Sequence, residues 1–422
     1  MPWRSVTSRF PVLASRDFRL LLADRLVAPA AFAFSLVGVA FAVLDAGGSA
    51  ADLSYVLAAQ IAPSLVFTLI GGVVADRIAP QRVIAAANLL IAAGEGTFGL
   101  LVLTGRPHLW QMILLETVTG CGMAVFYPAS QALLPVVAPG ELLQQGSAMS
   151  RLAMNAAQMA GSAVAGVVVA AIGPGWALAI CGAGVAGTVP LLLGIRAGAR
   201  ERVPGADLLA DIREGWAEFR SHTWLWAIVG QYCIVMMAWY GAFQVLGPVV
   251  AKAHLGGPAA WGAITASESV GLVAGGLIAL GRGPRHPMLF VAVIGGVIAT
   301  SPLSLAMLWP LPLICLASLG VGAMTEIMMV QWTVAMARNI PPGKLARVSA
   351  YDALGSMMAM PVGALAAGPI AAVIGVQRTQ YAAAALIIAV SAVALIPRDV
   401  RGMRADAAAP PSLPAADPAP ES

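Results

Sequence analysis

Long apolar runs separated by short polar segments make up almost the whole chain. Twelve of these runs are close to or longer than the roughly 20 residues that an α-helix needs to cross a bilayer. They lie near 19–43, 53–75, 83–103, 109–134, 147–172, 175–195, 224–250, 259–280, 288–307, 310–335, 346–374 and 378–396. The pattern therefore predicts an all-α membrane protein with twelve transmembrane helices.

The composition supports a membrane protein. Hydrophobic residues make up 59% of the chain and charged residues 10%, whereas about a quarter of the residues of a soluble domain are charged. A water-soluble fold cannot bury this much apolar surface, so lipid must be the solvent. The basic segment 1–19 precedes an apolar run that is too long for a signal-peptide core, and we expect this run to remain as the first span.

Basic residues are divided unevenly between the two sides of the predicted bundle. If the N-terminus is cytoplasmic, 20 of the 24 lysines and arginines fall in cytoplasmic segments. Only Arg106, Lys252 and Arg378 fall in the opposite loops, and Arg25 lies within the first span. Cytoplasmic loops retain basic residues, and the excess of arginine over lysine is typical of a GC-rich bacterial genome. We therefore expect a multi-pass protein of the bacterial cytoplasmic (inner) membrane with both termini in the cytoplasm.

The longest cytoplasmic loop, 196–223, divides the spans into two groups of six. It contains apolar residues at helical spacing between charged ones, which predicts an amphipathic helix on the membrane surface. These residues are Leu208, Ile212, Trp216 and Phe219. We expect a six-helix bundle over 1–195, this linker, a second six-helix bundle over 224–400, and a disordered cytoplasmic tail over 401–422, which is rich in alanine and proline.

The two groups of spans carry similar glycine patterns. The segment GGVVADRIAPQR begins at Gly71, and a decayed copy, GGLIALGRGPRH, begins 204 residues later at Gly275. Gly120, Gly122 and Gln131 recur as Gly320, Gly322 and Gln331, and Gly161, Gly166 and Gly173 recur as Gly363, Gly368 and Gly375. The nearly constant offset predicts tandem repeats, and hence two pseudo-symmetric six-helix bundles.

Three motifs resemble those of the major facilitator superfamily of transporters. The family's turn after helix 2 reads G-x-x-x-D-R-x-G-R-R, and the segment from Gly71 to Arg82 is similar to it. FYPASQALLP at 126–135 and ADIREGWAEF after span 6 are similar to the branch that exports drugs, macrolides and siderophores. The resemblance covers roughly 16–397 and implies two rigid halves that rock about a central cavity lined by helices 1, 4, 7 and 10.

The resemblance also implies a cytoplasmic gate at the turn after helix 2. The gate residues would be Gly72, Asp76, Arg77 and Arg82, whereas Ala79 and Pro80 replace the family's glycine and arginine. Asp76 is expected near 344–347 at the start of helix 11, where the helix dipole and basic side chains favour an anion. Leu280 replaces this aspartate in the second copy, so Asp76 would carry the latch alone. Alternatively, the turn is only a basic topology signal.

Small residues on helix 5 partly match a motif of the family's antiporters, G-P-x-x-G-G. Gly161, Ser162, Ala165 and Gly166 match in part, and the proline is lost. One interpretation is tight helix packing, which small residues allow in any membrane bundle. The other is that the motif marks an exporter.

Five carboxylates fall within the predicted spans, and we predict that they bind protons or cations. They are Glu116, Glu326, Asp24, Glu268 and Glu95. An ionised side chain in the middle of the bilayer costs about 3 kcal/mol, and Arg25 and Arg151 are the candidate partners among the cations. Each acid must therefore form an ion pair, take up a proton or face a wet cavity.

The family resemblance ranks these five acids. Glu116 and Glu326 would lie on cavity helices 4 and 10, which makes them the strongest candidates for coupling. Many proton antiporters of the family carry an arginine at the place of Glu116, so this residue would be a proton carrier or an anchor for a cationic substrate. Asp24 is a local pair with Arg25, a gate or a coupling site. Glu95 could form an interhelical hydrogen bond or take part in coupling, and the same two alternatives apply to Glu268.

The seventh predicted span carries aromatic and methionine residues at helical spacing. They are Tyr232, Met236, Trp239, Tyr240 and Phe243. One broad face of such residues suits bulky apolar ligands, because aromatic and methionine side chains repack easily. We predict that this face contacts the substrate, with core packing as the alternative.

These observations favour a secondary active transporter, expected to export a hydrophobic or amphiphilic small molecule such as a drug, an antibiotic or a siderophore-like metabolite in exchange for protons. The alternative is an importer or uniporter of a small metabolite. The four histidines lie in loops or at span ends, and H-E-x-x-H, G-x-S-x-G and phosphate-loop motifs do not occur. We therefore expect no enzyme activity, no ATP drive, no cofactor and no metal, and a monomer that interacts with its substrate, protons and lipid but not with nucleic acid.

Overall fold

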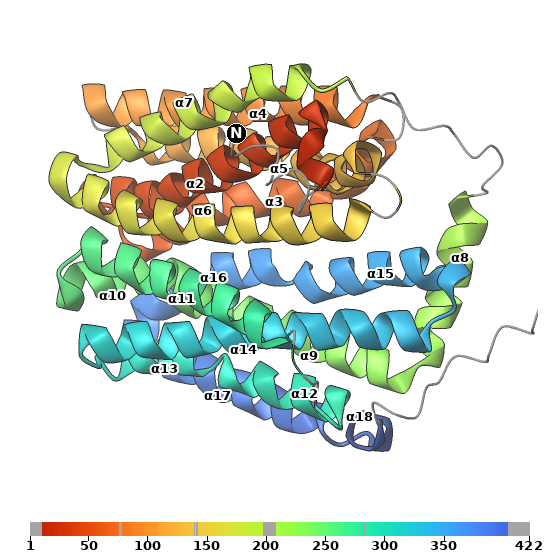
Figure 1. Ribbon diagram of the computed structural model, residues 1–422. Coiled ribbons are helices and arrows are strands. Elements are labelled where there is room, and N and C mark those ends of the chain that lie inside the picture. Colours follow the sequence, from red (N-terminus) through yellow and green to blue (C-terminus); the bar gives the residue numbers. More distant parts are fainter. Residues whose placement is uncertain are drawn as a thin grey trace, which may run out of the picture.

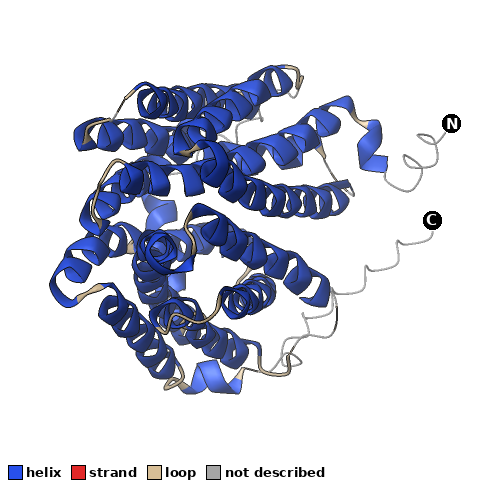
Figure 2. Cartoon of the chain, turned by 90° about the vertical axis from the view of Figure 1, so that its left-hand side faces the viewer, coloured by secondary structure: helices blue, strands red, loops and turns tan. Residues whose placement is uncertain are grey.

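The computed structural model describes residues 11–75, 78–105, 107–138, 140, 142–196, 208–279, 281 and 284–403. Its regular elements in these ranges are all helices (Figure 2). Eleven stretches in the described part are long and apolar enough to cross a membrane. They coincide with eleven of the predicted spans, and the helix Ala50–Ala75 coincides with the remaining one, 53–75.

The first six long helices form one half of the molecule, shown in the upper part of Figure 1. They follow a short 3-10 helix, η1 (Pro11–Ala14). The Ser15 hydroxyl accepts a hydrogen bond from the Phe18 backbone N–H and caps the first of them. They are α2 (Arg16–Asp45), α3 (Ala50–Ala75), α4 (Pro80–Thr104), α5 (Leu109–Val137), α6 (Leu142–Ile172) and α7 (Pro174–Leu193).

The second half contains six further spans, three of which are interrupted. The seventh consists of α9 (Thr223–Trp239), the π-helical η2 (Tyr240–Val245), α10 (Leu246–Val250) and the π-helical η3 (Ala251–Leu255). The others are α11 (Pro258–Ala279), α12 with α13 (Pro287–Val297 and Thr300–Ala306), α14 (Leu311–Asn339), α15 with α16 (Pro342–Met357 and Met360–Ile374) and α17 (Val376–Ala394). The short α18 (Arg398–Gly402) follows.

The linker forms a helix, α8 (Leu208–Ser221), which lies at one end of the bundle (Figure 1). We call this end the linker end and the other the opposite end. The Trp216 ring contacts the rings of Phe219 and Tyr351, the latter on α15, with centroids 5.7 and 5.5 Å away. Trp216 and Phe219, two of the four apolar residues that the sequence predicted on one face of this helix, therefore pack against the second half.

The predicted tandem repeat is visible in how glycines place the helices. The chain reverses direction at Gly173 and again at Gly375, both with φ near +90°, a conformation that glycine adopts without strain. A Cβ on Gly120 would collide with the Gln60 carbonyl of α3, and one on Gly322 would collide in the same way with the Glu268 carbonyl of α11. The α3–α5 and α11–α14 packings are thus equivalent.

This equivalence corrects the predicted register of one part of the repeat. The sequence paired Gly120 with Gly320, but a Cβ on Gly320 would have no atom within 4 Å. Gly322 makes the contact that corresponds to that of Gly120, so the offset here is 202 residues. The same offset relates Gly161 and Gly166 to Gly363 and Gly368, which makes the repeat more regular than the sequence comparison indicated.

The two halves meet closely near the opposite end. Gly166 of α6 packs against α11, and Gly368 of α16 packs against the first turn of α3, where its N–H donates to the Ser54 hydroxyl at 2.7 Å. Lys252 of η3 reaches α2 of the other half, with its Nζ 2.7 Å from both the Asp45 carboxylate and the Leu44 carbonyl. Two symmetric helix crossings and one ion pair therefore close this end.

Candidate functional site

Two of the predicted acids, Glu95 and Glu116, lie together inside the first half. Both carboxyl groups are buried, and Glu95 lies close enough to Glu116 for its charge to act on that carboxyl group. The Ser35 hydroxyl of α2 donates to Glu95 Oε1 at 2.6 Å, and Gln60 Nε2 of α3 donates to Glu116 Oε2 at 2.7 Å. Four adjacent helices, α2 to α5, thus contribute to one polar cluster.

Glycines set the helix spacing that brings these two acids together. A Cβ on Gly94 of α4 would collide with the Thr119 hydroxyl of α5. Gly120 plays the same part between α5 and α3, against the Gln60 carbonyl. Because Gly94 precedes Glu95 and Gly120 lies one turn after Glu116, the close crossings place both carboxyl groups between the helices.

The hydrogen bonding of the pair leaves room for a proton. Glu95 Oε2 and Glu116 Oε1 have no hydrogen-bond partner within the described ranges. Two carboxylates that share a site without a cation repel one another, so one readily takes up a proton. The cluster can therefore hold at least one proton in a place that water does not reach in this conformation.

Asp24 and Arg25 form a second polar group near the linker end of the same half. Both side chains are buried. The Arg25 guanidinium donates to the hydroxyl and to the carbonyl of Ser130 on α5, the latter at 2.9 Å. Asp24 lies beside Arg25 and within reach of Thr188 on α7. The Arg25 hydrogen bonds tie α2 to α5, whereas Asp24 Oδ1 has no hydrogen-bond partner within the described ranges.

Glu326 of α14 lies at the interface of the two halves on the linker side. Its Oε1 is 3.9 Å from Nη1 of Arg151 on α6. The arginine side chain is 73% exposed and the glutamate 18%, so solvent screens this pair strongly. Glu326 thus forms a weak ion pair with Arg151, one of the two candidate partners identified from the sequence.

Glu268 and the aromatic residues of the seventh span do not share one surface. Tyr232 lies within electrostatic range of Glu268, whereas Tyr240 lies within range of Glu116 in the other half. Phe243 has no exposed surface and packs on Trp239 and Trp261, with ring centroids 5.5 and 5.1 Å away. The π-helical turn η2 begins at Tyr240, and Phe243 makes core contacts within it.

Tyr232 lines a cavity of about 160 Å³ in the second half. Its wall combines aromatic, methionine and aliphatic side chains with one carboxylate, Asp352. Trp332 Nε1 donates to Asp352 Oδ2 at 2.9 Å, and the Ser356 hydroxyl donates to Oδ1 at 3.3 Å. No lysine, arginine or histidine in the described part of the chain forms an ion pair with Asp352. The cavity therefore presents an uncompensated acid beside polarisable apolar groups.

Asp352 was missed by the sequence reasoning, although the signal was present. It lies inside the predicted span 346–374, so it belongs among the intramembrane acids. Its position six residues from the start of that span makes it resemble an acid of the preceding loop. The indole donor that holds it, Trp332, comes from another helix and is not visible in the spacing.

The predicted gate is described only in part. Asp76 and Arg77 lie outside the described residues, Gly72 belongs to α3, and Arg82 is exposed on the first turn of α4. Among the basic residues expected near Asp76, Lys344 and Arg347 form ion pairs with the linker helix within the described ranges. Lys344 Nζ lies 2.9 Å from Glu218 Oε2, and Arg347 pairs with Glu214.

This linker clamp, formed by Glu214, Glu218, Lys344 and Arg347, lies outside the spans or at the end of one. The hydrogen bond from Lys344, followed by that from His222 at 3.2 Å, holds the pKa of Glu218 below its ordinary value. The same bond raises the pKa of Lys344. In this conformation the start of α15 is thus held by α8.

Within the described ranges, no group of three or more His, Cys, Asp or Glu side chains could hold a metal ion.

Comparisons with known proteins agree on one family. The sequence model of the Major Facilitator Superfamily matches residues 26–351. The chain is 28% identical over 412 residues to the multidrug efflux pump Tap of Mycolicibacterium fortuitum, covering 93% of this chain and 97% of Tap. It is 24% identical over 382 residues to macrolide efflux protein A of Streptococcus pyogenes, covering 86% and 92%. The crystal structure of nucleoside transporter NupG is similar in fold, with a TM-score of 0.72, 11% identity and coverage of 90% and 98%.

Proposed function

Since the chain belongs to the Major Facilitator Superfamily, a family of transporters, we propose that it exports a hydrophobic or amphiphilic small molecule in exchange for protons. The observation that carries the coupling is the buried pair Glu95–Glu116, in which each carboxyl has one hydrogen-bonded oxygen and one without a partner among the described residues. Similarity to proteins named for macrolide and multidrug efflux supports the direction and the substrate class.

Proton coupling requires a group that is protonated in one state and ionised in the other. The present conformation buries Glu116 completely, which favours the neutral form because an unpaired charge in the membrane is expensive. Gly120, whose contact with α3 fixes this helix, and Tyr240 of the other half both lie near it. A rocking motion that separates the halves would admit water to Glu116 and release its proton.

The cavity beside Asp352 supplies the proposed substrate contact. Tyr232, Met328 and Trp332 provide a polarisable apolar wall, and Asp352 adds one negative charge. Such a surface suits a bulky amphiphile, and a positive group on the ligand would gain from the carboxylate. The volume of about 160 Å³ admits only part of a drug-sized molecule, so the remainder would extend from the wall between the halves.

The conformation fits a state open toward the linker end. The crossings at Gly166 and Gly368 and the Lys252–Asp45 pair close the opposite end. On the linker side, the exposed Arg151–Glu326 ion pair joins the halves within the described ranges. With both termini and the linker in the cytoplasm, as the distribution of basic residues predicts, this state would load substrate from the cytoplasm or the inner leaflet.

The proposal is tested by transport in proteoliposomes loaded with ethidium or a macrolide antibiotic. An imposed pH gradient should drive export from the side bearing the linker, and a protonophore should reduce transport to the rate of empty liposomes. Proton movement measured with a pH dye should require substrate. Gradient-independent transport at full rate would overturn the coupling, and preferential uptake in the opposite direction would favour the importer alternative.

A further inference from the structure

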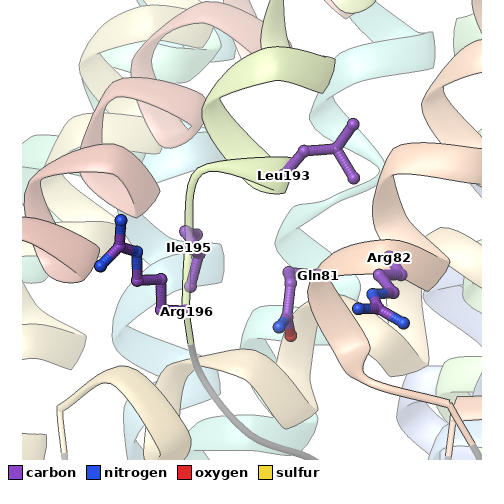
Figure 3. Close-up of a pocket in the computed structure, with 5 residues that line it drawn as sticks. All are labelled: Gln81, Arg82, Leu193, Ile195 and Arg196. Carbon is purple, nitrogen blue, oxygen red and sulfur yellow. The ribbon is translucent and has the colours of Figure 1, made fainter.

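Two neighbouring hollows at the linker end share Arg82. The first, of about 270 Å³, lies where α4 begins and α7 ends, and is lined by Gln81, Arg82, Leu193, Ile195 and Arg196 (Figure 3). In that view Gln81 lies between the two arginines. The second, of about 250 Å³, is an apolar groove that begins at Arg82 and runs between α4 and α5.

The first hollow carries positive charge that the described protein does not neutralise. Neither the Arg82 nor the Arg196 guanidinium forms an ion pair or a hydrogen bond within the described ranges. Asp17 Oδ2 accepts a hydrogen bond from the Arg196 backbone N–H at 3.3 Å. Both arginines line the hollow, and guanidinium groups are well suited to bind a phosphate group.

The second hollow has the shape and chemistry of an acyl-chain groove. Its walls are Val83, Ala86 and Leu90 of α4 and Cys121 and Val125 of α5. From Arg82 to Leu90 it follows α4 for about 12 Å, given a rise of 1.5 Å per residue. The direction is from the end of the span toward its middle, as an acyl chain runs from its headgroup.

The location agrees with the boundary of a membrane. The hollows lie at the start of one span and the end of another, Pro80 and Leu193. Leu193 is 59% exposed and Leu90 is 40% exposed, which in a membrane protein places them against lipid. Arginines at this depth reach the headgroup layer, where anionic lipids gather near basic residues.

We propose that this site binds an anionic phospholipid, with its phosphate between Arg82 and Arg196 and one acyl chain in the α4–α5 groove. A free phosphate would satisfy the arginines but would leave the groove empty, whereas a zwitterionic lipid would bring a cation beside two guanidinium groups. The site depends on membrane embedding and not on proton-coupled export. Arg82 would then bind the lipid phosphate in addition to its predicted role in the cytoplasmic gate.

Binding is tested on the purified full-length protein in a mild detergent, with native mass spectrometry and titration by phosphatidylglycerol. Arg82→Gln with Arg196→Gln should weaken binding at least about tenfold, since two charge-assisted contacts are lost. Arg398→Gln, a change of an exposed arginine on α18, should leave it unchanged. Phosphatidylcholine with the same acyl chains should bind weakly to all proteins.

The groove is tested separately by Ala86→Phe, which places a ring at an exposed position of its wall. This variant should also weaken phosphatidylglycerol binding while leaving the binding of inorganic phosphate unchanged. Arg196→Gln alone, which changes a residue beyond the end of α7, should also weaken phosphatidylglycerol binding. Inorganic phosphate that binds as tightly as phosphatidylglycerol would overturn the lipid assignment, and so would wild-type binding by the folded double variant. Neither readout depends on transport.

Discussion

Gly166 of α6 and Gly262 of α11 face one another where the two halves meet. A Cβ on Gly166 would lie 2.8 Å from the Cα of Gly262, and a Cβ on Gly262 would lie 2.6 Å from the Cα of Gly166. Nothing larger than hydrogen fits on either side without moving a backbone. Gly161, the other glycine of the partial antiporter motif, packs on Ala30 of α2 within the first half. The motif therefore combines internal packing with contact between the halves.

Gly166→Val should force α6 and α11 apart at the opposite end. Overpacking costs about 1–3 kcal/mol, so the closed contact should be weakened by about fivefold or more. Efflux in proteoliposomes should fall accordingly. Gly187→Val is the matched control, because a Cβ on Gly187 of α7 would have no atom within 4 Å. Equal loss of transport in both variants would show a folding defect and not a defect of the interface.

Glu116→Gln should abolish transport driven by a pH gradient while allowing downhill equilibration of substrate. The amide keeps the size of the side chain and its contact with Gln60, but it cannot release a proton. Glu95→Gln should have a similar effect if the two acids share a proton. The measurement is the pH dependence of ethidium efflux, with Asp399→Asn, an exposed acid on α18, as the control. An unchanged pH profile in both glutamine variants would remove this pair as the carrier.

Arg151→Gln should change efflux by less than about fivefold, because an exposed ion pair contributes about 0–1 kcal/mol. The 3.9 Å distance to Glu326 and the exposed arginine both indicate a weak contact. Glu326→Gln should have the larger effect if this acid binds a proton or cation as the sequence predicts. Comparison of initial efflux rates decides between a structural pair and a coupling site. Equal small effects of both changes would show that Glu326 contributes only to the ion pair and not to coupling.

Asp352→Asn should weaken transport of a cationic amphiphile more than that of a neutral one. The carboxylate lies in the wall of the second-half cavity and is held by Trp332 and Ser356, and the amide keeps the shape while removing the charge. Half-saturating concentrations for ethidium and for neutral N-phenylnaphthylamine provide the comparison. Equal changes for both probes would indicate a packing effect, which Trp332→Phe should then reproduce.

The linker clamp should be insensitive to pH between about pH 8 and pH 9. The pKa of Glu218 is lowered from 4.5, so its stabilisation is present above 4.5 and is lost as the pH falls through the lower value. The pKa of Lys344 is raised from 10.5, so its stabilisation is present below 10.5 and is lost only at higher pH. Glu218→Gln should therefore lower the Tm equally at about pH 8 and about pH 9, and Arg220→Gln should not. A difference that changes between these pH values would contradict the assignment.

The spans could be predicted because a lipid bilayer requires long apolar helices, and the family could be predicted from sequence motifs. An apolar run of about 20 residues has few other uses, and the glycine repeat and the turn at Gly72 and Asp76 pointed to one fold. The proximity of Glu95 and Glu116 could not be predicted in the same way. It depends on where α4 and α5 cross, and that point is set by Gly94 against Thr119, a contact that no spacing along one helix reveals.

The residues of the seventh span show a second limit. A regular α-helix would place Tyr232 and Phe243 on one broad face. In the structure Tyr232 lines a cavity, whereas Phe243 lies in the core against Trp261 of α11. The hydrophobic period of one helix does not reveal which neighbouring helix covers each of its residues.

Lys252 departs from the charge rule that oriented the chain, and its pairing has a consequence for the medium. The Lys252 and Asp45 side chains are 39% and 46% exposed, so the ions of the solution at the opposite end screen their attraction, over about 8 Å at physiological salt. Since that contact joins the two halves, ionic strength on this one side of the membrane shifts their equilibrium. Dissolved salt on that side thus changes the conformational equilibrium without binding at a specific site.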